Sequence, residues 1–270
     1  MKKSKQANEY NIIIKKINIK RKLTIITAII ISIAIIALTS PNHLEILDRT
    51  IINTKGIHPI FTVMLVLLVI IIATVAYAIV SIQTATSLNV ECDPQKYLNL
   101  NAALTKGKAL IPIYATGYLY IGNFLLAMEY AVKMIVSGKE NWLMAGLFNK
   151  ARCEFLLGNY EIMKGTVQQY ASALSNIKKV NPAYPKFHEI MILMCAIADN
   201  DQNIINTYCK SIQPWNDSKA TEGFINYLKG VSAYSLGDKD ESIYRFMAVK
   251  DTCEKTVFSR LADEYLVQLK

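Results

Sequence analysis

Two long runs of uncharged, apolar residues constrain this chain more than any other feature. The first is Leu23–Ser40, with 18 residues, and the second is Ile60–Ile82, with 23 residues; neither contains Asp, Glu, Lys or Arg. A helix needs about 20 mainly apolar residues to cross a bilayer, because each residue adds about 1.5 Å across a hydrocarbon core of about 30 Å. We therefore predict transmembrane helices at residues 23–40 and 60–82.

Two other structures could in principle contain such apolar runs. A buried core helix of this length usually carries a polar stripe, and neither run has one. A cleaved signal peptide would fit the basic flank of the first run, but its apolar core exceeds the usual length of about 7–15 residues. No small-x-small cleavage site precedes Pro41. A buried core helix and a cleaved signal peptide therefore both fit these runs less well than membrane spans do.

The net charge of +9 is concentrated in one tail. Residues 1–22 contain eight basic residues and one acidic residue, residues 41–59 are neutral, and residues 83–270 contain 20 basic and 18 acidic residues. Basic residues beside a span stay in the cytoplasm. The tail 1–22 and the domain 91–270 are therefore predicted to be cytoplasmic, with the loop 41–59 outside, where we interpret it as a simple connector. The abundance of Ile, Asn and Lys suggests an AT-rich bacterial genome, so we expect the membrane to be a bacterial plasma membrane.

The part after the second run has the pattern of helices. Apolar residues recur at intervals of three and four, as at Leu143, Leu147, Ala151 and Phe155. Asp93 before Pro94 is typical of a helix N-cap followed by proline in the first turn. With only 19% charged residues and 52% hydrophobic residues, the chain is not intrinsically disordered. We expect an all-α domain with helices at residues 94–106, 109–121, 124–136, 140–157, 160–178, 186–198, 201–211, 218–236, 239–250 and 253–269.

Three similar turns recur within this helical part. Their glycines are Gly122, Gly158 and Gly237, and a small residue lies seven positions before each: Ala115, Ala151 and Gly230. Glycine permits the left-handed conformation that ends a helix before an antiparallel partner. The small residue lets the two helices approach closely. A weaker fourth copy, residues 197–200, lacks the glycine.

These residues resemble the tetratricopeptide repeat, a helical hairpin of about 34 residues. The resemblance covers residues 108–250 and includes Tyr118, Phe124 and Ala127 in the first unit, Tyr160 in the second, and Phe246 and Val249 in the last. It implies an α-solenoid of helical hairpins. The last helix, residues 253–269, would cap the solenoid with a polar outer face. The period here is longer than 34, and Lys150 and Lys229 replace the usual Leu before the small residue.

The resemblance also implies a concave groove lined by the first helix of each hairpin. Aromatic residues and Arg are the types that anchor interfaces. The groove positions in this sequence are Thr116, Tyr120, Phe148, Arg152, Phe155, Tyr227 and Tyr234. The alternative for Phe155 and some of the tyrosines is that they fill the space between helices. The carboxylate clamp of some relatives is not expected, because its positions here are Pro112 and Thr116.

Motifs for catalysis are missing from the sequence. His188-Glu189 begins a zinc-protease pattern, but Ile192 stands where the second histidine is needed. The five widely spaced cysteines, none in a Cys-x-x-Cys motif, are typical of reduced thiols. The basic tail lacks the interleaved aromatic residues of a nucleic-acid platform. We expect no enzyme activity, no cofactor, no metal and no nucleic-acid partner.

The sequence therefore predicts a membrane-anchored interaction module, a scaffold or adaptor. Its expected partners are the lipid bilayer and a cytoplasmic protein or peptide. Two alternatives stay open: an accessory or regulatory subunit of a membrane transport or secretion complex, and an enzyme subunit of an unrecognised type.

Overall fold

Residues 84–269 form a series of helices joined by short turns. The computed structural model describes these residues continuously and, before them, residues 19, 26–27, 67–72, 74–75, 78 and 82. All regular structure in these ranges is helical, which confirms the all-α prediction for them. The helices are α4 (Pro94–Leu104), the short 3-10 helix η1 (Gly107–Ala109), α5 (Leu110–Ile121), α6 (Phe124–Val136), α7 (Glu140–Leu156), α8 (Tyr160–Ser175), α9 (Ala183–Asp199), α10 (Gln202–Ser211), α11 (Lys219–Ser235), α12 (Lys239–Cys253) and α13 (Val257–Gln268).

The chain divides into two compact units, Met1–Gln83 and Thr84–Lys270. Among the described residues, none of the helices combines the length and the apolar character needed to cross a membrane. The predicted spans 23–40 and 60–82 lie mostly outside the described residues, as do the tail 1–22 and the loop 41–59. Within the first unit, residues 67–72 are helical and expose the apolar side chains of Leu67, Ile70 and Ile71.

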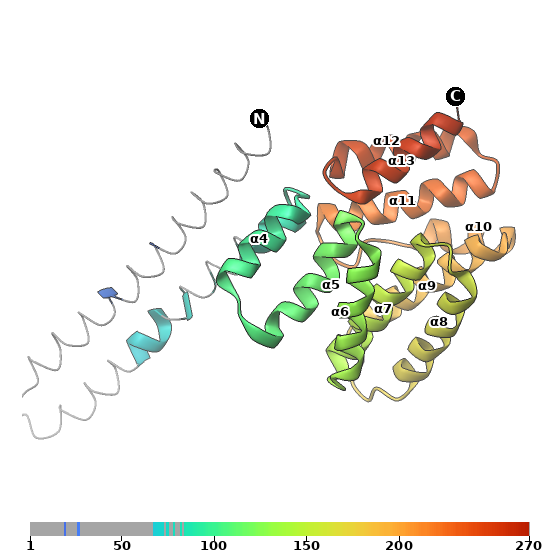
Figure 1. The fold of residues 1–270 in the computed structure, drawn as a ribbon. Helices are drawn as coiled ribbons and strands as arrows, with labels where there is room; N and C mark the ends of the chain where they lie inside the picture. The colour runs from blue at the N-terminus through green and yellow to red at the C-terminus, as the bar shows by residue number, and fades with distance from the viewer. Residues whose placement is uncertain are drawn as a thin grey trace, which may run out of the picture. The chain divides into compact units, whose positions relative to one another are not determined.

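Successive helices of the second unit pair as hairpins. Helix α5 packs on α6, α7 on α8, α9 on α10, and α11 on α12. The first helices of the hairpins also contact one another in order, α5 with α7, α7 with α9, and α9 with α11. The last helix, α13, contacts both α11 and α5, so the C-terminal end of the series meets its beginning (Figure 1).

The turns between paired helices use the left-handed conformation that the sequence predicted. Gly122 ends α5 with φ 92°, and its N–H donates to the carbonyls of Tyr118 and Leu119. Gly158 and Gly237 have φ 74° and 75°. In the hairpin without a glycine, Asn200 takes this role with φ 52°. Asn tolerates this region better than most other residues, so the turn between α9 and α10 keeps the same geometry.

Small residues let the paired helices approach closely. A Cβ atom at Gly230 would lie 2.7 Å from a ring carbon of Phe246, which is fully buried. The same holds between successive hairpins, because a Cβ atom at Gly146 of α7 would lie 2.8 Å from the carbonyl oxygen of Ala131 on α6. Such distances are shorter than van der Waals contact, so a larger side chain would force the helices apart.

The observed helices follow the predicted ranges closely. The largest difference is at the last helix, which was expected from residue 253 and begins at Val257. Helix α9 was expected from residue 186 but begins at Ala183, so Pro185 lies inside its first turn. Proline is compatible with the first turn of a helix, where the missing N–H has no intrahelical acceptor.

An aromatic cluster joins the beginning and the end of the series. Phe258 of α13 is fully buried, and its ring centroid lies 5.4 Å from that of Tyr120 on α5. On α11, the rings of Phe224 and Tyr227 lie 5.1 Å and 5.5 Å from it. These contacts connect α5, α11 and α13 around one side chain.

Candidate functional site: a buried arginine in an aromatic pocket

A pocket of about 160 Å³ opens among the first helices of the hairpins. Its walls come from the segment before α4, from α5, α7, α9 and α11, and from the loop between α10 and α11. We call it the Arg152 pocket. It is lined by Leu88, Asn89, Thr116, Tyr120, Ala145, Phe148, Asn149, Arg152, Phe187, Trp215, Asn216, Ser218, Ala220 and Thr221.

The guanidinium group of Arg152 lies buried in this pocket with few polar partners. The residue is 2% exposed. Its Nη2 atom donates to Oδ1 of Asn149, one turn earlier on α7. Nε and Nη1 have no hydrogen-bond partner. Within the described part of the chain, no carboxylate forms an ion pair with Arg152. A guanidinium group stays protonated in proteins, so a positive charge is buried here without a counter-ion.

Four aromatic rings surround this charge. The Cζ atom of Arg152 lies 4.6 Å from the ring centroid of Phe148 and 5.1 Å from that of Phe224. The corresponding distance is 5.8 Å for both Tyr120 and Trp215. The negative ring faces attract a cation, by about 2 kcal/mol where it is desolvated. The rings thus offset part of the cost of burial, but they provide no hydrogen-bond acceptor in the guanidinium plane for the N–H groups of Nε and Nη1.

The apolar wall of the pocket is a stack of three rings. Phe148 and Phe187 lie face to face, with centroids 4.2 Å apart and planes at 6°. The indole of Trp215 stands edge-on to both, at 5.4 Å and 5.3 Å. The edge-on arrangement is a favoured geometry of aromatic pairs. The wall combines side chains from α7, α9 and the loop before α11.

Polar groups complete the pocket near the start of α11. Ser218 is the N-cap of α11, and its hydroxyl donates to Oδ1 of Asn89. Burial raises the pKa of the Tyr120 hydroxyl, and the charge of Arg152 opposes part of that rise. The tyrosine is therefore neutral at physiological pH and can accept or donate a hydrogen bond.

The structure brings four of the seven predicted groove residues together. Thr116, Tyr120, Phe148 and Arg152 all line the Arg152 pocket. The other three lie elsewhere: Phe155 packs near Tyr160, Tyr227 lies in the Phe258 cluster, and Tyr234 packs on Tyr265 of α13. Five of the seven are buried, whereas Tyr234 is exposed and Thr116 is partly exposed.

Sequence reasoning missed Phe187, Trp215 and Phe224. Phe187 and Phe224 lie on α9 and α11, whose register against α7 is set by tertiary packing. Trp215 lies in the loop between α10 and α11, where helical periodicity carries no information. One signal was present: Trp215 is one of only two tryptophans in the chain and follows a proline.

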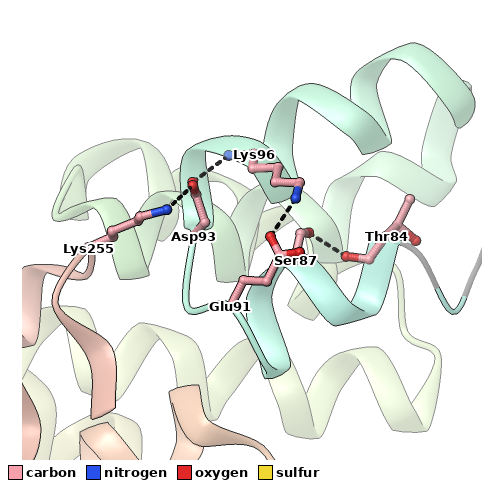
Figure 2. A network of polar contacts seen from close by, with 6 residues as sticks. All are labelled: Thr84, Ser87, Glu91, Asp93, Lys96 and Lys255. Atoms are coloured by element: carbon pink, nitrogen blue, oxygen red, sulfur yellow. Dashed lines mark hydrogen bonds and ion pairs between the residues drawn. The ribbon is translucent and has the colours of Figure 1, made fainter. Parts of the chain in front are cut away.

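A second feature joins residues far apart in the sequence. Asp93 is the N-cap of α4, and Lys255 lies in the loop between α12 and α13. Oδ2 of Asp93 accepts a hydrogen bond from Nζ of Lys255 at 2.9 Å (Figure 2). Lys96 of α4 pairs with Glu91 beside it, and the Ser87 hydroxyl donates to the carbonyl of Thr84. The Asp93–Lys255 ion pair thus joins the N-cap of α4 to the C-terminal part of the domain, whereas the other two contacts are local.

The same junction contains two cysteines in contact. The Sγ atoms of Cys92 and Cys253 lie 2.7 Å apart, both buried, and Cys92 has φ 47°. The hydrogen bond between the two thiols lowers the pKa of Cys92. All five cysteines of the chain are free thiols here. A thiolate is the reactive form in disulfide chemistry, so Cys92 is the better nucleophile of the pair.

We expect mild oxidation of the full chain with diamide to join Cys92 to Cys253. The two thiols would lose two protons and two electrons, and diamide would be reduced to the hydrazine. Because the sulfurs need move only slightly to reach a bond of about 2.05 Å, most molecules should cross-link. Non-reducing digestion and mass spectrometry would identify the linked peptides. Cys253→Ser is the control, and a Cys92 thiol that stays fully alkylatable after unfolding would contradict the expectation.

The described residues contain no group of three or more His, Cys, Asp or Glu side chains that could hold a metal ion. His188 stacks against Tyr170 with ring centroids 6.0 Å apart, and burial lowers its pKa. No protein-family description, curated protein or solved structure matches this chain. The tetratricopeptide resemblance therefore stays a prediction.

Proposed function

We propose that this chain is a membrane-anchored interaction module of the tetratricopeptide type. In this proposal residues 23–40 and 60–82 cross a bacterial plasma membrane, and the tail 1–22 and the domain 91–270 face the cytoplasm. The domain binds a protein or peptide partner at the mouth of the Arg152 pocket. The helical hairpins and their left-handed turns support the repeat assignment.

The anchor is supported by two observations. The second apolar run is helical where it is described, and its Leu67, Ile70 and Ile71 side chains are exposed. Exposed apolar side chains on one helix are costly in water and favourable in lipid. The eight basic residues of the tail would also attract anionic lipid, by about 1 kcal/mol for each residue near the surface.

The single observation that carries the binding role is the composition and position of the Arg152 pocket. It lies among the first helices of the hairpins and combines Arg152 with Tyr120, Phe148 and Trp215. Arg, Tyr and Trp dominate the binding energy of interfaces. The buried charge without a counter-ion is a structural cost that a bound partner would relieve.

A site-specific photocross-link in cells that naturally make the protein tests this role. Benzoylphenylalanine would replace Thr116, which is partly exposed at the pocket, in the full chain. The matched control replaces Val132 of α6, which is 43% exposed and does not line the pocket.

We expect a protein adduct of one defined mass from position 116 only, and we expect Arg152→Ala to reduce it at least tenfold. Equal amounts of adduct from positions 116 and 132 would contradict the proposal. So would an adduct at position 116 whose amount is unchanged by Arg152→Ala.

A further inference from the structure

The charge balance of the pocket indicates the sign of its ligand. Arg152 brings one positive charge into a site that is otherwise aromatic and neutral. A buried charge is stabilised only when it is paired and its hydrogen bonds are made. Nε and Nη1 are still available as donors, and Asn149 satisfies only Nη2. A ligand group with one negative charge would pair with the guanidinium charge and accept the hydrogen bonds of these donors at once.

The same balance argues for a carboxylate on an apolar body. A phosphate monoester carries close to two negative charges, and no second cation lines the pocket. The carboxylate group is planar and accepts charge-assisted hydrogen bonds from guanidinium groups. The ring stack of Phe148, Phe187 and Trp215 offers the apolar contact surface beside it.

The volume of the pocket limits the size of that body. At about 160 Å³ it is smaller than the pockets of drug-sized ligands, which begin at about 300 Å³. An engineered apolar cavity of about 150 Å³ holds one benzene molecule. The pocket therefore has room for a single ring or a short alkyl chain with its carboxylate.

We propose that the Arg152 pocket binds an organic monocarboxylate with an apolar body about the size of benzoate. The carboxylate accepts hydrogen bonds from Nε or Nη1 of Arg152, and the apolar body packs against Phe148, Phe187 and Trp215. The carboxylate belongs either to a free small-molecule acid or to the C-terminal residue of a partner chain. The inference rests on the proposed function insofar as both use this pocket, but its test needs no protein partner.

The test uses the tryptophan in the pocket wall as its reporter. The chain has two tryptophans, so Trp142→Phe leaves Trp215 as the only one. The full chain in mild detergent would be titrated with phenylacetate and with phenylacetamide, its neutral isostere, at constant ionic strength. A second pair of probes, the peptide Ala-Ala-Phe with a free carboxylate and its C-terminal amide, would be titrated in the same way.

We expect a saturable change in Trp215 fluorescence with phenylacetate, at least tenfold weaker with phenylacetamide. Arg152→Gln should weaken phenylacetate binding at least tenfold, with Arg152→Lys between the two. Arg245→Gln removes a partly exposed arginine of α12 that does not line the pocket, and it should leave the affinity unchanged. The acid and amide pairs act on one protein, so the result does not depend on how well any Arg152 variant folds.

The two pairs of probes separate this inference from the proposed function. If phenylacetate and Ala-Ala-Phe both bind better than their amides, both sources of the carboxylate fit the pocket. If only phenylacetate does, the carboxylate site stands and binding of a partner's chain end at this pocket fails. If neither acid binds better than its amide, the inference is overturned, whatever the cross-linking experiment shows.

Discussion

Replacing Phe258 with alanine is expected to lower the free energy of unfolding by about 3–5 kcal/mol, the usual cost of removing a buried phenylalanine ring. Phe258 is fully buried and contacts Tyr120, Phe224 and Tyr227. Its ring is shared by α5, α11 and α13, so its loss leaves a cavity where the end of the helical series meets its beginning. Urea denaturation of the full chain in mild detergent measures the effect.

The control for this prediction is an aromatic residue on the neighbouring helix α12. Tyr244 is 62% exposed, and Tyr244→Ala should change stability by no more than about 0.5 kcal/mol. A loss below about 1 kcal/mol for Phe258→Ala would mean that α13 does not close the series in solution.

The second large effect is expected at Lys150, where the repeat pattern usually has Leu. Nζ of Lys150 donates to Oε1 of Glu154 and to the hydroxyl of Thr166, which itself donates to Oε2 of Glu154. Glu154 is 2% exposed, so this network buries a carboxylate between α7 and α8. Lys150→Leu would leave that charge without its counter-ion and should cost about 3 kcal/mol.

A double-mutant cycle separates this effect from ordinary packing. Lys150→Leu with Glu154→Leu removes both charges and should recover most of the lost stability, because apolar pairs often replace buried ion pairs without loss. Lys164→Leu is the matched control on α8, since its partners Glu161 and Asp199 are exposed. Its cost should stay below about 1 kcal/mol. A neutral Lys150→Leu would contradict the role of the network.

Most helices and turns could be predicted from the sequence because they depend on local rules. Asp93 and Pro94 set the start of α4 as expected, and the Asp93 side chain accepts from the N–H of Lys96. Gly122 ends α5 in the left-handed conformation, and Asn200 substitutes for glycine in the third hairpin. These features depend on the conformations that single residues allow, so they can be recognised without knowledge of the tertiary fold.

The candidate site could be predicted only in part, because it depends on contacts between distant residues. Phe148 and Arg152 lie four positions apart on α7, so their shared face follows from helical geometry. That α13 would close onto α5 does not follow from periodicity. This closure buries Tyr227 against Phe258 and takes it out of the predicted groove. The packing of α9 and of the loop before α11 against Phe148 of α7 brings Phe187 and Trp215 to the Arg152 pocket.

The most direct test of the central claim observes the Arg152 side chain itself. The chain has five arginines, so a full chain labelled with ¹⁵N-arginine gives few Nε–H signals, and Arg152→Lys identifies that of Arg152. If the buried guanidinium group is the carboxylate site, saturating phenylacetate shifts this signal and phenylacetamide at the same concentration does not. An Arg152 signal that stays unchanged while phenylacetate saturates the Trp215 response would contradict the account, because the ligand would then bind without using the buried charge.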